Sequence, residues 1–217
     1  MSNMKENRTY TFSVEGNTEQ WYLYRLQELI NQSLEAKYRV KFNVKVEQRP
    51  LRLIKSINSI TIPSIIHLCD IESQIEEHEK KFRNVLDEMK EVQKQKKVKY
   101  SLGYCNYTFD LWMVLHKKDC KTSFIDSTKY LEEINDGYDM NFISLDQYKT
   151  KNNFDKCLSR ISLKEVHNAI DRAEKIMNNN SNIYKVIEYK KYSYYKENPS
   201  LTIWKHIKNI LKECGIL

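Results

Sequence analysis

Glycine and proline are scarce in this chain of 217 residues, which has four glycines and three prolines. Turns must therefore be built largely from Asn, Asp and Ser. No Cys-x-x-Cys pair occurs among the five cysteines, so the sequence indicates neither a zinc site nor a disulfide framework. The simplest interpretation is free thiols in a reducing compartment, and we expect a cytoplasmic protein.

Long apolar runs are also missing. The N-terminus has no apolar stretch typical of a secretion signal, and no apolar segment approaches the roughly 18 residues that a membrane-spanning helix needs. We therefore expect no membrane span and no membrane partner. What the chain does have is a formal net charge of +7. A basic protein attracts polyanions, and this favours nucleic acid as a partner, although many basic proteins bind none.

Strand and helix patterns alternate through the first half of the chain. Strands are expected at residues 8–14, 38–48, 64–69 and 98–104. Helices are expected at residues 18–36, 50–59, 74–95 and 108–116. This order predicts the α/β fold class, with a parallel sheet flanked by helices.

The pattern loosens after residue 117. Residues 121–154 are polar and rich in Asn and Asp, whereas helices are expected again at 162–177 and 201–211, the last with Ser200 as a candidate N-cap. We therefore divide the chain into a first domain at residues 1–117 and a mainly helical C-terminal extension at residues 118–217 that packs on it.

Acidic residues follow two of the predicted strands. Glu15 comes directly after the first strand, in VEGNTEQ, and Asp70 and Glu72 follow the third, in HLCDIES. Ligands of open α/β sheets bind beyond the carboxyl ends of the strands. Mg²⁺ is usually held by one or two carboxylates together with waters and substrate phosphates. These acids therefore predict a site for Mg²⁺ or Mn²⁺, at which Glu15 binds the metal or accepts a proton.

Each of these acids also has a plainer interpretation. Glu15 can be a solvated loop residue, and Asp70 and Glu72 can cap the helix that follows them. Glu19 suits the first turn of a helix, where negative charge is favoured, and it is an accessory site candidate. Gly16 marks a place where the backbone turns sharply or closely approaches another group.

Further candidates lie in the stretch CNYTFDLWMVLH. Asp110 opens the helix expected there, and it can join the other acids if that helix points its N-terminus at them. Asn106 is an accessory candidate whose alternative role is a helix cap. His116 is an accessory candidate for protonating the leaving oxygen, and its alternative is a hydrogen-bonded structural residue. Trp112 and its apolar neighbours are expected in the core.

Two basic stretches are candidates for contacts with a phosphate backbone. The first, KEVQKQKKVK, contains Lys96 and Lys97, and its alternative is the solvated end of a helix. The second, YKVIEYKKYSYYK, contains Lys190 and Lys191. Aromatics interleaved with lysines suit single-stranded nucleic acid or a tRNA loop. The alternative for this stretch is an amphipathic strand whose tyrosines pack.

Four segments, in order, resemble the RloB-like family of Toprim-domain proteins. FSVEGNTEQWYL resembles the first Toprim motif, and HLCDIES resembles the paired-acid second motif, usually Asp-x-Asp, with Glu72 as the second acid. CNYTFDLWMVLH resembles the family's Asn-Pro-x-Phe-Glu-x-Trp-x-x-x-His stretch, with Tyr107 in place of Pro and Asp110 in place of Glu. NPSLTIWKHIKNIL resembles the closing segment of the family, so the matches span residues 11–211.

The resemblance implies a Toprim-like catalytic domain at residues 1–117, with a divalent-metal site at Glu15, Asp70 and Glu72. It also implies a role in bacterial anti-phage defence by abortive infection, often beside an ATPase encoded in the same locus. Topoisomerases and primases need further modules, which leaves a nuclease. The missing Gly-rich phosphate loop argues against a nucleotidyl transferase or a cyclic-nucleotide sensor.

We therefore predict a Mg²⁺-dependent nuclease that cleaves phosphodiester bonds in RNA, such as tRNA, or in DNA, and that works as a homodimer or in a complex. The alternative is a non-catalytic module of a defence complex that binds nucleic acid or an ATPase.

Overall fold

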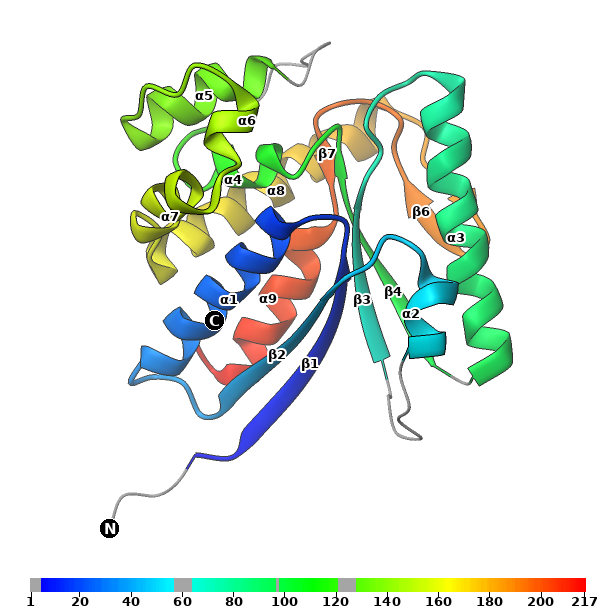
Figure 1. Cartoon of the computed structure of the whole chain (residues 1–217), viewed down its shortest axis with the longest axis horizontal. Helices are drawn as coiled ribbons and strands as arrows, with labels where there is room; N and C mark the ends of the chain where they lie inside the picture. Colours follow the sequence, from blue (N-terminus) through cyan, green and yellow to red (C-terminus); the bar gives the residue numbers. More distant parts are fainter. Residues whose placement is uncertain (1–4, 57–63, 97, 121–127) are drawn as a thin grey trace.

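A five-stranded sheet lies at the centre of the computed structural model, which describes residues 5–56, 64–96, 98–120 and 128–217 (Figure 1). In the order β2-β1-β3-β4-β7, the strands are β2 (Arg39–Val46), β1 (Asn7–Val14), β3 (Ser64–Asp70), β4 (Lys99–Asn106) and β7 (Ser200–Leu201). The first four strands are parallel, and β7 pairs antiparallel with β4. The carboxyl ends of β1 to β4 therefore meet at one edge of the sheet.

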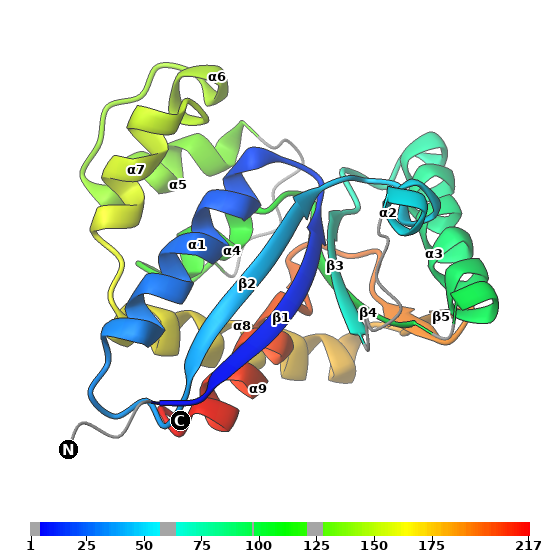
Figure 2. The same ribbon diagram turned by 60° about the horizontal axis from the view of Figure 1, so that its bottom comes forward.

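Helices cover both faces of the sheet (Figures 1 and 2). One face carries α1 (Asn17–Gln32), α4 (Asp110–Leu115), α8 (Leu163–Ile183) and α9 (Ile203–Cys214), with α5 (Lys129–Tyr138), α6 (Leu145–Tyr148) and α7 (Lys151–Ser159) beyond them. The other face carries α2 (Pro50–Ser56), α3 (Glu76–Lys96) and the hairpin of β5 (Ile187–Tyr189) and β6 (Tyr192–Tyr194).

Each face of the sheet has its own hydrophobic cluster. Phe12 and Val14 of β1 pack with α1, α4 and α9, whereas Tyr100 and Tyr104 of β4 pack with α3 and the hairpin. This division follows from the strand geometry, because successive side chains point to opposite faces. The α/β prediction is confirmed, and the arrangement is consistent with a Toprim-like fold. No helix in the described parts of the chain combines the length and apolar character needed to cross a bilayer.

The polar segment after residue 117 is more ordered than its sequence pattern indicates, because it contains α5, α6 and α7. The signal in α5 is a four-residue spacing of large side chains: Tyr130, Ile134 and Tyr138 are all buried. Polar residues fill the positions between them, so the stretch looks like a loop when only composition is considered. One hydrophobic cluster joins this segment to Trp112 and to residues of α1 and α9. The domain boundary near residue 118 stays a prediction.

The predicted helix cap at Ser200 is wrong. Ser200 lies in β7, and the last helix begins at Ile203 with Thr202 in the cap position. The cause is a long-range pairing: the Thr202 backbone N–H donates to the Tyr104 carbonyl at 2.8 Å, and Thr202 Oγ1 accepts from the Tyr104 backbone N–H at 3.1 Å. They continue the pairing of β7 with β4, in which Ser200 lies opposite Asn106.

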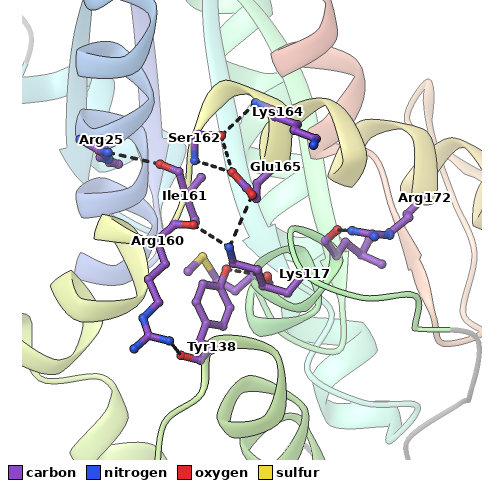
Figure 3. Close-up of polar contacts among 11 residues, drawn as sticks. Arg25, Lys117, Tyr138, Arg160, Ile161, Ser162, Lys164, Glu165 and Arg172 are labelled. Atoms are coloured by element: carbon purple, nitrogen blue, oxygen red, sulfur yellow. Dashed lines mark hydrogen bonds and ion pairs between the residues drawn. The ribbon is translucent and has the colours of Figure 1, made fainter.

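A polar network fixes the start of α8 against the other helices (Figure 3). Ser162 and Glu165 form a capping box, in which the Ser162 backbone N–H donates to Glu165 Oε2 at 2.9 Å. Lys117 Nζ donates to the Arg160 carbonyl at 2.6 Å, and Arg25 Nη2 donates to the Ile161 carbonyl at 3.2 Å. The turn before α8 is thus tied to α1 and to the segment after α4.

We expect Ser162→Ala to lower the free energy of unfolding by about 1 kcal/mol, because it removes the acceptor at the N-terminus of a long helix. Urea denaturation followed by circular dichroism measures this change. Ser181→Ala in the same helix is the matched control, since Ser181 is exposed and its hydroxyl donates to the Asn178 carbonyl within its own helix. Equal stability of the two variants would contradict the capping role.

Candidate acidic site at the carboxyl edge of the sheet

Glu15 and Asp70 meet because β1 and β3 are neighbouring parallel strands. Val14 pairs with Leu68, so both chains leave the sheet at the same edge. The Glu15 carboxylate lies close enough to the Asp70 backbone for that backbone to lower its pKa, against the larger effect of burial. The convergence expected from the two strand ends is therefore present in the structure.

Asp110 and Glu19 join this pair from two helix N-termini. The Phe109 backbone N–H, just before α4, donates to Asp70 Oδ2 at 3.1 Å. The next residue, Asp110, is 1% exposed, and Thr108 Oγ1 donates to its Oδ2 at 3.1 Å. Glu19, in the first turn of α1, is 5% exposed and accepts from Thr18 Oγ1 at 2.9 Å.

We call Glu15, Glu19, Asp70 and Asp110 the acidic cluster. The pKa of Glu15 is raised to about 8, mainly by burial and secondly by the charge of Glu19. Burial and the charges of Glu15 and Glu19 raise the pKa of Asp70, and burial raises the pKa of Glu19, with Asp110 contributing. Like charges in a poorly solvated site favour the protonated forms. A cation bound at the acidic cluster would therefore be strongly favoured by electrostatics.

Gly16 is required by a close approach to this cluster. Its φ of −140° is extended and open to any residue, so no sharp turn needs glycine here. A Cβ at this position would lie 3.2 Å from Glu19 Oε2. The glycine thus leaves room for the Glu19 carboxylate beside the backbone.

One lysine reaches the acidic cluster from the C-terminal segment. Lys149 Nζ lies 3.0 Å from Asp110 Oδ2, and 39% of the Lys149 side chain is exposed. Burial alone would lower the pKa of Lys149, but the charges of Asp110, Asp70 and Glu19 outweigh it and raise the pKa. Sequence analysis missed this residue, because it lies in the polar segment between α6 and α7 where no motif marks it.

Glu72 lies at the rim of the acidic cluster. Its φ of 62° is in the left-handed region, which non-glycine residues seldom adopt. Its carboxylate pairs with Lys81 of α3 and, at 3.3 Å, with His78 Nε2. The alternative interpretation is that Asp70 and Glu72 cap the helix that follows them. Their described contacts differ from this, because Asp70 accepts from the Phe109 backbone N–H at the start of α4. A metal-binding role for Glu72 stays a prediction.

Asn106 and His116 have structural contacts. The Asn106 side-chain amide donates to the carbonyls of three consecutive residues, 195–197, at 2.8–3.3 Å, so the predicted helix cap is wrong. His116 is 1% exposed, with Nε2 3.2 Å from Tyr22 Oη and Nδ1 2.8 Å from the Trp112 carbonyl. Burial lowers the pKa of His116 to about 3. These contacts match the structural alternative for His116 rather than proton donation.

Of the four basic candidates, the structure describes the side chains of Lys190 and Lys191. Lys97 and the Lys96 side chain are outside the described residues. Lys190 and Lys191 form the turn between β5 and β6, with φ of 52° and 76° as a two-residue hairpin requires. Tyr192 and Tyr194 of this hairpin are buried, so the packing interpretation holds for these two tyrosines. Contact of Lys190 and Lys191 with nucleic acid stays a prediction.

The chemistry of the acidic cluster suits a hard divalent cation. Within the described ranges, no three His, Cys, Asp or Glu side chains stand together as a ready-made metal cage. Mg²⁺ needs no such cage, because one or two carboxylates with waters and substrate oxygens complete its shell. The carboxylates of the acidic cluster therefore fit Mg²⁺ or Mn²⁺, with only one or two of them binding the ion directly.

This geometry defines an α/β protein with an acidic site at the carboxyl edge of a largely parallel sheet. The model of the family described as RloB-like protein matches residues 10–210. The match covers most of the chain, and the protein belongs to the RloB-like family. No curated protein and no solved structure gives a significant match.

Proposed function

We propose that this protein is a Mg²⁺- or Mn²⁺-dependent nuclease with a Toprim-like catalytic site, acting on RNA or DNA in anti-phage defence. The observation that carries the proposal is the meeting of Glu15, Asp70 and Asp110 at one sheet edge, with carboxyl pKa values raised for Glu15 and Asp70. A polyanionic substrate agrees with the net charge of +7.

In this proposal Asp70 and Asp110 hold the cation, with Glu15 beside them. The cation, when bound, neutralises charge on the phosphate and polarises its oxygens. With the cation bound beside it, Glu15 would be held in its charged form, and it would accept the proton of the attacking water or ribose 2′-hydroxyl as a general base. Lys149, beside Asp110, and Lys81, whose charge acts on Glu15, would supply positive charge for the phosphate oxygens.

A defence nuclease that cuts without control would be toxic, so the proposal includes a regulating partner, an ATPase encoded in the same locus, and a cytoplasmic location. A homodimer would enlarge the surface available to a long substrate.

The test is cleavage of mixed tRNA, single-stranded DNA and duplex DNA with Mg²⁺, with Mn²⁺ and with EDTA. We expect metal-dependent cleavage, lost in EDTA, and reduced by about 100-fold or more in Glu15→Gln, which cannot accept the proton. Glu35→Gln is the matched control, because Glu35 is exposed in the loop between α1 and β2, at the opposite end of the sheet.

Cleavage that survives EDTA and Glu15→Gln would refute the proposed site. Binding without cleavage, with and without the ATPase, would favour a non-catalytic module instead.

A further inference from the structure

A pocket of about 510 Å³ opens beside the acidic cluster. Glu15 forms part of its wall, so the pocket and the proposed metal site share a residue. The other lining residues are Gln48, Arg49, Lys81, Asn84, Val85, Asp87 and Glu88. They come from the β2–α2 connection and from one side of α3. Pockets of roughly 300–1,000 Å³ are the usual size for small ligands, and a nucleotide falls within that range.

The Arg49 guanidinium is held in place on the wall of this pocket. Arg49 Nε and Nη2 both donate to Glu88 Oε1, at 2.8 and 2.6 Å. Glu88 is itself anchored, because its Oε2 accepts from the Leu51 backbone N–H at 3.1 Å. A guanidinium fixed in this way offers a flat face on which an aromatic ring can stack.

Lys81 lines the pocket and also interacts with carboxylates of the acidic edge. It pairs with Glu72, and its positive charge acts on Glu15. A phosphate that passes from the acidic cluster toward the pocket would meet this ammonium group. One pocket wall therefore offers both positive charge for a phosphate and a flat face for a ring.

Two amides of the pocket have unused hydrogen-bonding capacity. The Gln48 and Asn84 side chains are exposed and line the pocket, and neither has a hydrogen-bond partner among the residues that the structure describes. Each amide offers donors and an acceptor, the combination that the edge of a nucleobase requires.

We propose that this pocket binds the nucleoside adjoining the phosphodiester bond to be cut, with its base stacked on Arg49 and its edge read by Gln48 and Asn84. The proposal rests on the nuclease function and specifies its substrate class. A base enters such a pocket only after leaving its stack, and this costs least in single strands and loops. The preferred substrate is therefore single-stranded nucleic acid or a loop, rather than a regular duplex.

The binding test needs no cleavage. The ¹⁵N-labelled full chain is titrated with AMP, GMP, CMP and UMP in EDTA, and the side-chain amide signals of Gln48 and Asn84 are followed by NMR. We expect at least one nucleotide to shift both signals. The double variant Gln48→Ala/Asn84→Ala should weaken this binding by about tenfold or more, since two hydrogen bonds are lost. Asn152→Ala/Asn178→Ala, at exposed positions of α7 and α8, is the matched control.

A cleavage assay separates failure of this proposal from failure of the nuclease function. With a single-stranded RNA oligonucleotide, the Gln48/Asn84 double variant should raise KM with little change in kcat. Nucleotide binding without any cleavage would leave the pocket assignment standing and count against the nuclease. Absence of any shift at millimolar nucleotide, or unchanged affinity in the double variant, would overturn the pocket assignment.

Discussion

We expect Asp70→Asn to lower metal-dependent cleavage by about 1,000-fold and, at the same time, to stabilise the metal-free protein. The loss of cleavage follows from removing the carboxylate that we propose holds the cation, an interaction worth several kcal/mol. The gain in stability follows from the raised pKa values of Glu15, Glu19 and Asp70, since each carboxylate raises the energy of the others. Asparagine keeps the acceptor for the Phe109 backbone N–H but carries no charge.

The pH dependence of stability has a definite sign. The pKa of Glu15 is about 8 in the folded protein and 4.5 when unperturbed. Between these values the folded state holds a proton that the unfolded state has lost, so stability falls as pH rises. Below pH 6.5 the buried neutral His116 opposes this trend, because unfolding lets it take up a proton. Between pH 6.5 and 8, therefore, the effect of Glu15 on stability can be measured without the opposing effect of His116.

In that window we expect the metal-free wild type to lose on the order of 2 kcal/mol of unfolding free energy as pH rises. Asp70→Asn should lose clearly less, and added Mg²⁺ should stabilise the wild type more at pH 8 than at pH 6.5. Guanidinium denaturation at several pH values measures all three. Asp171→Asn, at an exposed position of α8, is the control. A wild-type profile that is flat in EDTA would contradict the acidic cluster as an electrostatically strained site.

The second large effect is expected from Lys149→Met, which leaves buried Asp110 without its counter-charge. Removing one partner of a fully buried pair costs about 3–5 kcal/mol. Because the Lys149 side chain is 39% exposed, water screens the pair, and we expect about 1–2 kcal/mol at pH 7.5. Methionine retains much of the aliphatic length, so the change reports mainly on charge.

A double-mutant cycle with Asp110→Asn isolates the pair. In the Asp110→Asn background, Lys149→Met should cost little, because there is no longer a carboxylate to neutralise. Lys151→Met is the matched control, since Lys151 pairs with Asp155 on the surface of α7. If the cost of Lys149→Met were the same in both backgrounds, the lysine would act through packing and not through Asp110.

Local sequence pattern predicted the parts of this structure that depend on local physics. Alternating strand and helix periodicity gave the parallel sheet, and two strand ends placed Glu15 and Asp70 at one edge. The errors came from contacts between distant segments. Asn106 resembles a helix cap in sequence, but its amide bonds to carbonyls about 90 positions later in the chain. Lys149 reaches Asp110 from a segment whose composition resembles a loop.

The place of β7 in the sheet has a consequence for how the protein is made. Strand β4 has β3 on one side, and its other neighbour is a two-residue strand near the end of the chain. The Asn106 side-chain amide likewise has its hydrogen-bond acceptors in the later residues 195–197. While the chain is still emerging from the ribosome, the strand that leads to Asp110 therefore lacks its final partner. The acidic edge of the sheet therefore takes its final form only after residues 195–201 have been synthesised, long after Asp110 itself.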